Sequence, residues 1–201
     1  PDVNTNEQTM AWIADTFMST KSSSERSNNK HVVTGKPVGS GGLEGRDRAT
    51  GFGVYITLRL LFDSRKESLK GKKFIVQGFG NVGYWASKFL TDDGALLIAV
   101  QDAHATLINE NGISVANLHE HSKPRKGSVK GFEGGTEMEP EDFFGLECDF
   151  IIPAALGNQI TEKNAGKIKS KVIAEGANGP TNNEGERILL ANGVTIIPDI
   201  L

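Results

Sequence analysis

The feature that most constrains this chain is a short apolar run followed at once by three regularly spaced glycines. Residues Phe74–Val76 predict a buried strand, and the pattern Gly78-x-Gly80-x-x-Gly83 comes directly after it. Apolar side chains at helical spacing then follow from Trp85 onward. Strand, glycine turn and helix in this order are the setting in which such a motif binds a dinucleotide. The alternative is a glycine turn that serves only to pack the helix.

Each glycine of the motif has a physical role in the dinucleotide interpretation. Gly78 permits the tight turn off the strand, and Gly83 lets the new helix pack closely against it. Gly80 has no Cβ, so the backbone can come close to a pyrophosphate. The phosphates then lie on backbone N–H groups at the helix start, where the macrodipole amounts to roughly half a positive charge.

The bulk composition is that of an ordinary globular protein and excludes several classes of function. A chain of 201 residues can bury a core without disulfides or metal. The formal net charge of −3 argues against a nucleic-acid binder. We find no apolar run that approaches the ~20 residues of a membrane span, and no signal peptide. The lone Cys148 indicates a reducing compartment, which we expect to be the cytoplasm, or the mitochondrial matrix in a eukaryote.

The histidine spacing and the chain ends carry less information than the glycine motif. His119 and His121 are two residues apart in a predicted helix, so their side chains point to different sides and we assign no metal site. The chain starts at Pro1 and stops just past a predicted strand at Leu201. These ends are typical of a piece cut from a longer protein.

Helix and strand patterns alternate along the chain. A helix capped by Thr5 or Asn6 comes first, and the glycine-dense segment 34–53 predicts an ordered loop rather than a flexible linker. Further helices are predicted over residues 49–65, 84–93, 115–121, 161–168 and 184–192, and strands over 74–76, 95–100, 171–174 and 194–197. Residues 106–111 predict a short strand and a turn, and residues 149–155 predict a strand that breaks at Pro153. We therefore expect an α/β fold of the Rossmann type, with a doubly wound, mostly parallel sheet covered on both faces.

The loops that follow the predicted parallel strands should line one crevice. These loops contain Gly78, Asp102, Ala154 and Asn178. In doubly wound sheets, ligands bind beyond the carboxyl ends of the strands, where such loops meet.

Asp102 is a candidate for binding the adenosine ribose. It follows the second strand, about 20 residues after the glycine turn, which is where an acidic residue accepts hydrogen bonds from ribose hydroxyls. A carboxylate there repels a 2′-phosphate and therefore favours NAD over NADP. Two alternatives remain open: Asp102 is a solvated loop residue, or the neighbouring Gln101 holds the position.

Several motifs together resemble those of the glutamate dehydrogenases, and they occur in that family's order over essentially the whole chain. The motifs are Pro1–Asn6, Gly45-Arg46-x-x-Ala49-Thr50-Gly51, Gln77–Gly83, Ile152–Ala155, Ala174–Thr181 and Pro198-Asp199. The resemblance implies that residues 1–201 are the dinucleotide-binding domain, in which residues 1–45 form an amino-terminal helix and a glycine-rich loop leading into the Rossmann core. It also implies that the substrate domain is absent from this chain.

The resemblance assigns a catalytic role to one residue of this chain. Asp2 resembles the family's catalytic aspartate, which moves a proton between the substrate nitrogen and the water that attacks the imine. The implied reaction is the oxidative deamination of L-glutamate to 2-oxoglutarate and ammonia. The family's catalytic lysine lies in the absent domain, so we expect this chain alone to bind NAD and to turn over no glutamate.

The resemblance also assigns the cofactor contacts, with NAD as the expected cofactor and NADP as the alternative. Thr50 and Asn81 resemble the residues that hold the nicotinamide carboxamide, which needs both a donor and an acceptor. The remaining implied contacts are Gly78, Gly80, Val82 and Gly83 at the pyrophosphate, Asp102 at the adenosine ribose, Ala154, Ala155 and Asn158 at the nicotinamide ribose, and Asn178 near the nicotinamide.

Other interpretations of the same fold remain open. The related leucine, valine and phenylalanine dehydrogenases usually lack the signature found here at residues 45–51, so that signature favours a glutamate enzyme. A non-catalytic dinucleotide-binding module, or an enzyme for another ligand such as a methyl donor, would use the same fold. Two departures from the family pattern, Gly157 and Asn182-Asn183, lie in loops at the crevice edge. The family is usually hexameric, so we expect a homo-hexamer for the full-length enzyme.

Overall fold

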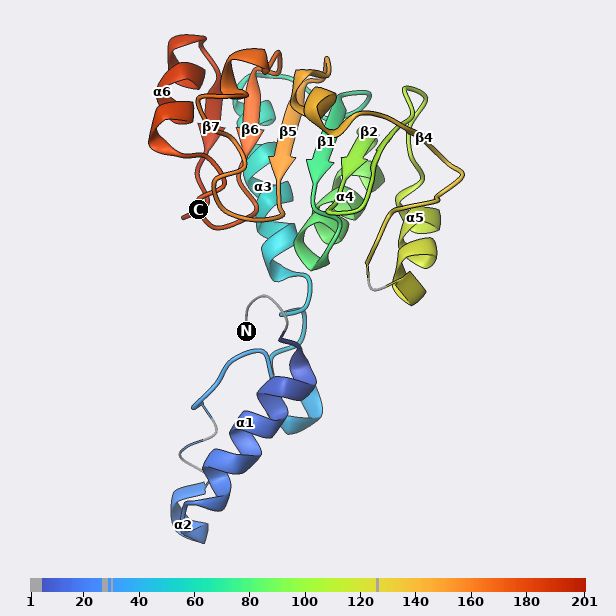
Figure 1. Cartoon of the computed structure of the whole chain (residues 1–201). Helices are drawn as coiled ribbons and strands as arrows, with labels where there is room; N and C mark the ends of the chain where they lie inside the picture. The colour runs from blue at the N-terminus through green and yellow to red at the C-terminus, as the bar shows by residue number, and fades with distance from the viewer. Residues whose placement is uncertain (1–4, 27–28, 30, 126) are drawn as a thin grey trace. The chain divides into compact units, whose positions relative to one another are not determined.

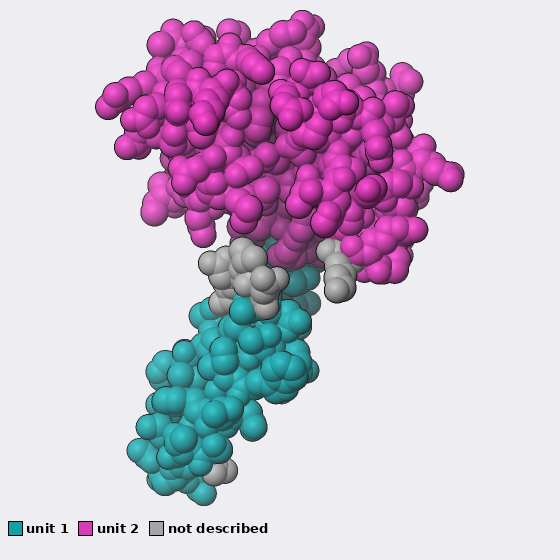
Figure 2. Space-filling view, viewed as in Figure 1, with its two compact units in different colours: residues 1–49 teal, residues 50–201 magenta. Residues whose placement is uncertain are grey.

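The computed structural model describes residues 5–26, 29, 31–125 and 127–201. The predicted catalytic Asp2 lies outside the described residues. The chain divides into two compact units, residues 1–49 and residues 50–201, which are coloured separately in Figure 2.

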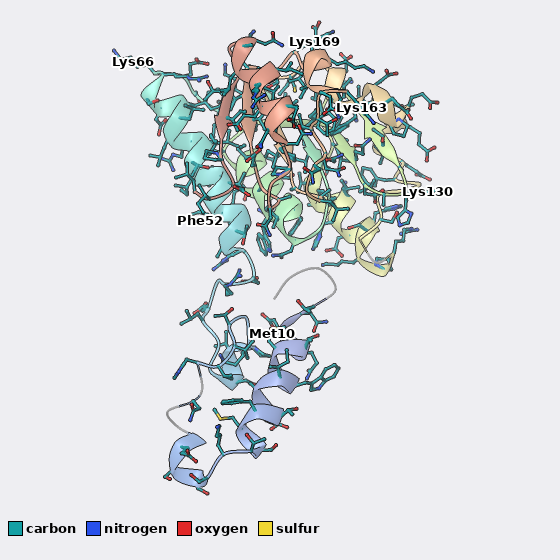
Figure 3. The ribbon with its side chains drawn as sticks, turned by 60° about the vertical axis from the view of Figure 1, so that its left-hand side comes forward. Met10, Phe52, Lys66, Lys130, Lys163 and Lys169 are labelled. Carbon is teal, nitrogen blue, oxygen red and sulfur yellow. The ribbon has the colours of Figure 1, made fainter. Side chains whose placement is uncertain are left out.

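The first unit is built around helix α1 (Glu7–Ser19), with the shorter α2 (Ser23–Arg26) and the 3-10 helix η2 (Val38–Ser40). Asn6 caps α1 by accepting a hydrogen bond from the Thr9 backbone N–H at 3.0 Å, which confirms one of the two predicted caps. Among the described residues of this unit, Met10 is the one buried hydrophobic side chain (Figure 3). Trp12, in contrast, is 64% exposed. This unit therefore has almost no apolar core of its own.

The second unit contains a seven-stranded sheet with the order β4-β3-β2-β1-β5-β6-β7 (Figure 1). Five neighbouring strands are parallel: β2 (Leu96–Gln101), β1 (Lys73–Gln77), β5 (Phe150–Pro153), β6 (Val172–Ala174) and β7 (Thr195–Ile197). The strands β3 (Thr106–Ile108) and β4 (Thr136–Glu137) add an antiparallel edge. The chain order reverses between β1 and β5, which is the switch point at which doubly wound sheets bind ligands. The predicted mostly parallel sheet is confirmed.

Both faces of the sheet are covered, as expected for strands that are buried on both sides. Along β1, Phe74 and Val76 belong to one core and Ile75 belongs to the other. The first core is closed by α3 (Ala49–Ser64), α4 (Asn81–Asp92) and α5 (Val115–Ser122), which continues into η3 (Lys123–Arg125). The second core is closed by η4 (Pro140–Gly145), η5 (Ala165–Lys167) and α6 (Asn183–Ala191).

The prediction of a helix over residues 161–168 is wrong. Turns and the short η5 occupy this segment instead. Asn164 closes the turn with its side chain: Oδ1 accepts from the Thr161 N–H at 2.8 Å, and Nδ2 donates to the Gln159 carbonyl at 2.8 Å. Asparagine side chains compete in this way with helical backbone hydrogen bonds.

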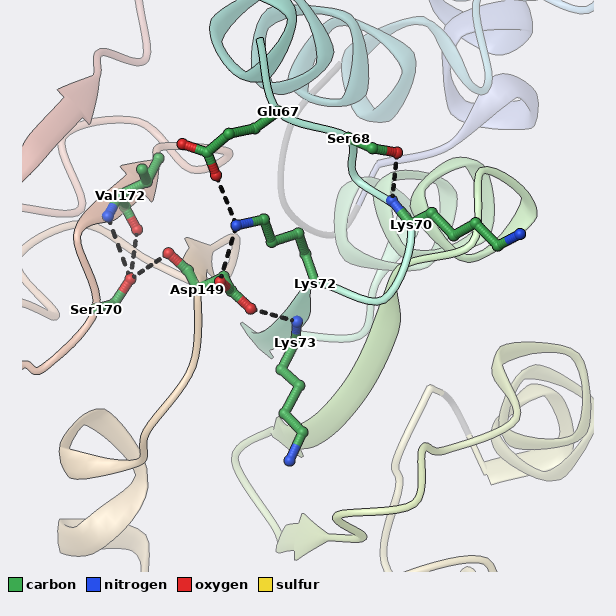
Figure 4. Close-up of polar contacts among 8 residues, drawn as sticks. All are labelled: Glu67, Ser68, Lys70, Lys72, Lys73, Asp149, Ser170 and Val172. Atoms are coloured by element: carbon green, nitrogen blue, oxygen red, sulfur yellow. Dashed lines mark hydrogen bonds and ion pairs between the residues drawn. The ribbon is translucent and has the colours of Figure 1, made fainter. Parts of the chain in front are cut away.

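Charged side chains tie the amino-terminal ends of the strands together (Figure 4). Lys72 Nζ lies 2.6 Å from Glu67 Oε2 and 3.4 Å from Asp149 Oδ1. Asp149 Oδ2 also accepts from the Lys73 backbone N–H at 2.7 Å, and Ser170 Oγ donates to the Asp149 carbonyl at 3.0 Å. The hydrogen bond to Glu67 raises the pKa of Lys72. These contacts therefore connect the starts of β1 and β5 and the segment before β6, at the end of the strands opposite the glycine turn.

We expect Asp149→Ala to lower the free energy of unfolding by about 1–2 kcal/mol, because it leaves the Lys73 N–H and Lys72 without this acceptor. Urea denaturation of the chain measures the loss. Glu147→Ala is the matched control, since Glu147 pairs with Lys169 at 3.3 Å through side chains that are 84% and 58% exposed. The control should lose less than about 0.5 kcal/mol. Equal losses in the two variants would contradict a structural role for Asp149.

Candidate functional site

The loops after β1, β2 and β5 meet at the carboxyl edge of the sheet. The Gly78 N–H donates to the Gln101 carbonyl at 2.7 Å, and the Ala154 N–H donates to the Gln77 carbonyl at 2.7 Å. These bonds continue the parallel ladder beyond the strands themselves. The glycine turn is therefore held between the end of β2 and the loop after β5.

The loops after β5 and β6 are joined in the same way. The N–H groups of Gly176 and Ala177 both donate to the Pro153 carbonyl at 3.0 Å. Asn158, whose φ of +55° lies in the left-handed region, donates its N–H to the Gly179 carbonyl at 2.9 Å. The four loops predicted to line one crevice therefore lie along one edge of the sheet.

Two glycines of the motif are required by the fold itself. Gly78 has a φ of +91°, and a Cβ there would lie 2.7 Å from the Ala154 carbonyl oxygen. A Cβ on Gly83 would lie 1.9 Å from the Gly78 carbonyl oxygen and 3.1 Å from Val76 Cγ1. A side chain at Gly83 would push α4 away from the end of β1, and one at Gly78 would push against Ala154 and Ala155 in the loop after β5. The roles of the two glycines in the turn and in helix packing are those inferred from the sequence.

Gly80 differs from its two neighbours in the motif, because neither its backbone nor its packing requires glycine. Its φ of −77° is accessible to any residue, and a Cβ would meet no described atom within 4 Å. Gly80 is also the N-cap of α4 and supplies no capping side chain, whereas Asn6, Ser114 and Asn182 cap α1, α5 and α6 through their side-chain oxygens. A helix start whose N-cap residue supplies no side-chain acceptor suits an anionic ligand.

Asp102 uses its carboxylate to hold two loops. Oδ1 accepts from the N–H groups of His104 and Ala105 at 2.7 and 2.8 Å. Oδ2 accepts from the Val129 N–H at 2.7 Å. Three of roughly four acceptor positions of the carboxylate are therefore occupied by backbone. This anchor holds Val129 beside the end of β2, and ribose binding by Asp102 stays a prediction.

The other predicted cofactor residues lie around the same edge of the sheet. Thr50 is exposed in the first turn of α3, where a Cβ on the adjacent Gly51 would lie 2.6 Å from Trp85 Cβ of α4. Asn81 and Asn178 are exposed, and the others (Val82, Ala154 and Ala155) are half-buried. Nothing in the described residues assigns a ligand to any of them, so their individual roles stay predictions.

Two carboxylates to which the sequence analysis assigned no role shape the loop after β6. Asp199 Oδ2 accepts from the Gly179 N–H at 2.7 Å, and Glu175 Oε2 accepts from the Asp199 N–H at 3.2 Å. Burial raises the pKa of the Glu175 carboxyl above its ordinary value. Both residues lie in motifs shared with the glutamate dehydrogenases, Glu175 in Ala174–Thr181 and Asp199 in Pro198-Asp199, and this was the available signal.

The described part of the chain offers no metal site and no membrane span, and its cysteine is unsuited to nucleophilic chemistry. It contains no group of three or more His, Cys, Asp and Glu side chains placed to hold a metal ion. It also contains no helix that is both long and apolar enough to cross a membrane. Burial raises the pKa of Cys148 to about 12, which is unfavourable for a reactive thiolate.

The model of the Glutamate/Leucine/Phenylalanine/Valine dehydrogenase family matches residues 41–201. The chain belongs to this family. It is 40% identical over 201 residues to proteins described as NAD-specific glutamate dehydrogenase in two Staphylococcus aureus strains, COL and MSSA476. These matches cover 100% of the chain and 47% of each relative. The chain thus spans about half the length of the curated relatives it matches.

Solved glutamate dehydrogenase structures confirm the fold of this family member. A hetero-hexameric enzyme from Thermus thermophilus (Leu bound form) superposes with a TM-score of 0.87 at 31% identity, covering 100% of this chain and 46% of that one. The enzyme from Peptoniphilus asaccharolyticus has a TM-score of 0.76 at 36% identity, again covering 100% and 46% of the two chains. The resemblance inferred from the motifs is confirmed, and so is the α/β fold class.

We expect Glu175→Gln to change how stability depends on pH. Because the pKa of Glu175 is raised on folding, the folded state binds the proton more tightly than the unfolded state. Stability is therefore lost as pH rises from the ordinary pKa of 4.5 through the raised value. A glutamine side chain at this position would remove this loss and would still accept from the Asp199 N–H.

Thermal unfolding between about pH 4 and about pH 7 measures the effect. The melting temperature of Glu175→Gln relative to wild type should increase toward neutral pH. Glu110→Gln, which neutralises an exposed carboxylate in a turn, is the control and should show no such trend. A constant difference between Glu175→Gln and wild type would contradict the burial argument.

Proposed function

We propose that this chain is the NAD-binding part of a glutamate dehydrogenase. The whole protein would convert L-glutamate to 2-oxoglutarate and ammonia, and the reverse. The observation that carries the proposal is Gly80, whose backbone and packing do not require glycine. It is the N-cap of α4, supplies no capping side chain, and lies at the switch-point edge of the sheet in a member of this family. Support for NAD and for glutamate comes from the relatives described as NAD-specific glutamate dehydrogenase.

The proposed cofactor site lies within residues 50–201. NAD supplies the hydride chemistry when it is bound, while the protein binds and orients it. The backbone at Gly80 and Val82 would hold the pyrophosphate at the start of α4. Thr50 and Asn81 would hold the carboxamide. The remaining proposed contacts are Asp102 at the adenosine ribose, Ala154, Ala155 and Asn158 at the nicotinamide ribose, and Asn178 near the nicotinamide.

The rest of the proposal concerns the longer protein. Asp2 would move the proton between substrate nitrogen and water, and the substrate-binding lysines would lie outside this chain. A hexamer is the proposed assembly, in line with the Thermus thermophilus relative, which is described as hetero-hexameric. The cytoplasm is the proposed compartment.

NAD titration of two glycine variants tests the cofactor site. We expect Gly80→Ala to weaken NAD binding by at least about tenfold, because the new methyl group would occupy the approach to the helix start. Its free energy of unfolding should change by less than about 1 kcal/mol, the range of N-cap substitutions. Gly83→Ala is the contrasting variant and should lose about 3 kcal/mol of stability through its clash with the Gly78 carbonyl. Unchanged NAD affinity in a folded Gly80→Ala protein would rule out a pyrophosphate at Gly80.

The cofactor preference tests the role of Asp102. The wild-type chain should bind NAD at least about tenfold more tightly than NADP, because the carboxylate repels a 2′-phosphate. Asp102→Asn should lower this preference, since it removes the charge. It keeps Oδ1 as an acceptor for the His104 and Ala105 N–H groups but loses the acceptor for the Val129 N–H. Calorimetric titrations of both nucleotides give the ratio. Tighter binding of NADP than of NAD by the wild type would contradict the assignment.

A further inference from the structure

Three glutamine side chains form a hydrogen-bonded chain beneath the carboxyl edge of the sheet. Gln77 ends β1, Gln101 ends β2, and the two are register partners across these parallel strands. They are 7% and 8% exposed. Gln77 Nε2 donates to Gln101 Oε1 at 2.9 Å and to Gln159 Oε1 at 3.1 Å. Burying side-chain amides at the ends of two central strands costs free energy of desolvation, so a function for them is expected.

One end of this glutamine chain is fixed at the adenosine side of the proposed site. Gln101 Nε2 donates to Thr106 Oγ1 at 2.9 Å and to the Pro140 carbonyl at 3.1 Å. A carbonyl can only accept, so the Gln101 amide must direct Nε2 to Pro140 and Oε1 to Gln77. Gln101 immediately precedes Asp102, whose carboxylate holds the loop after β2.

The other end is fixed at the nicotinamide side. Gln159 Nε2 donates to the Gly157 carbonyl at 3.1 Å, which again forces Oε1 toward Gln77. The Gln159 backbone N–H donates to the Pro180 carbonyl at 2.7 Å, beside the bond from the Asn158 N–H to the Gly179 carbonyl. Gln159 therefore connects the loop after β5 and the loop after β6 to the end of β1.

In the glutamine chain, the side-chain oxygens of Gln101 and Gln159 both accept hydrogen bonds from the amide nitrogen of Gln77. Both hydrogens of Gln77 Nε2 are used, one toward each half of the site. Gln77 Oε1 is buried and has no hydrogen-bond partner among the described residues. An unpaired buried oxygen destabilises a fold, so this arrangement is not the one that stability alone would favour.

We propose that Gln101, Gln77 and Gln159 position the nicotinamide-side loops relative to the adenosine-side loop, and so set the span of the site to that of a dinucleotide. The inference rests on the proposed function, because it takes NAD as the ligand of this edge. These are positioning residues, since they act through the loops that carry Asp102 and Asn158. NAD must bridge both halves, whereas ADP occupies only the adenosine half.

The test compares NAD and ADP affinities in the chain of residues 1–201. Gln159→Ala should weaken NAD binding about tenfold, the effect of losing one well-placed hydrogen bond, and leave ADP binding within about twofold of wild type. Gln159→Met keeps the side-chain volume without its hydrogen bonds. It should give the same split and carries the test if the alanine variant does not fold. Gln8→Ala, at an exposed glutamine of α1, is the matched control and should change neither affinity.

The outcomes separate this inference from the function it rests on. A wild type that binds neither NAD nor ADP overturns the proposed cofactor site. The second case is a wild type that binds both nucleotides. If Gln159→Met then weakens NAD and ADP binding equally, or weakens neither, the positioning role is overturned and the cofactor site is not affected. Selective loss of NAD affinity supports positioning, because a general loss of stability would not distinguish the two ligands.

Discussion

The structure depends on one close approach, in which the first turn of α4 lies against the carbonyl of Gly78. A Cβ at Gly83 would come within 1.9 Å of that oxygen, so only glycine lets the helix begin so near the end of β1. The helix start is thereby brought to the switch point, beside the loop after β5. The proposed pyrophosphate site depends on this placement, because the backbone N–H groups at a helix start bind an anion only where the anion can reach them.

The two edges of the sheet have different electrostatic character. At the amino-terminal edge, Lys72 and Asp149 are paired with each other and with backbone, an arrangement that stabilises the strand starts. At the carboxyl edge, the polar groups are in less favourable states: Gln77 Oε1 is buried without a partner among the described residues, and burial raises the pKa of Glu175. Destabilising polar groups at the carboxyl edge fit a binding site, where recognition of a ligand can outweigh the stability of the fold.

The sequence was sufficient for the fold and for the placement of the candidate site. The apolar run at Phe74–Val76 predicted β1, and glycine spacing predicted the turn and helix after it, because these signals are local. What could not be predicted depends on contacts between distant residues. The bond from Val129 to Asp102 joins positions 27 residues apart, and that from Gln77 to Gln159 joins positions 82 apart. The helix over 161–168 was wrongly predicted for a local reason, since Asn164 bonds to its own turn.

The anchoring role of Asp102 has a consequence for how cofactor preference can evolve in this chain. In the proposed ribose role of Asp102, a substitution that accommodates a 2′-phosphate also removes the acceptor for the Val129 N–H. The proposed cofactor selectivity and the structure of the loop at Val129 therefore depend on the same side chain. A single exchange changes both at once, and a productive switch requires a second residue that supplies a new acceptor for Val129.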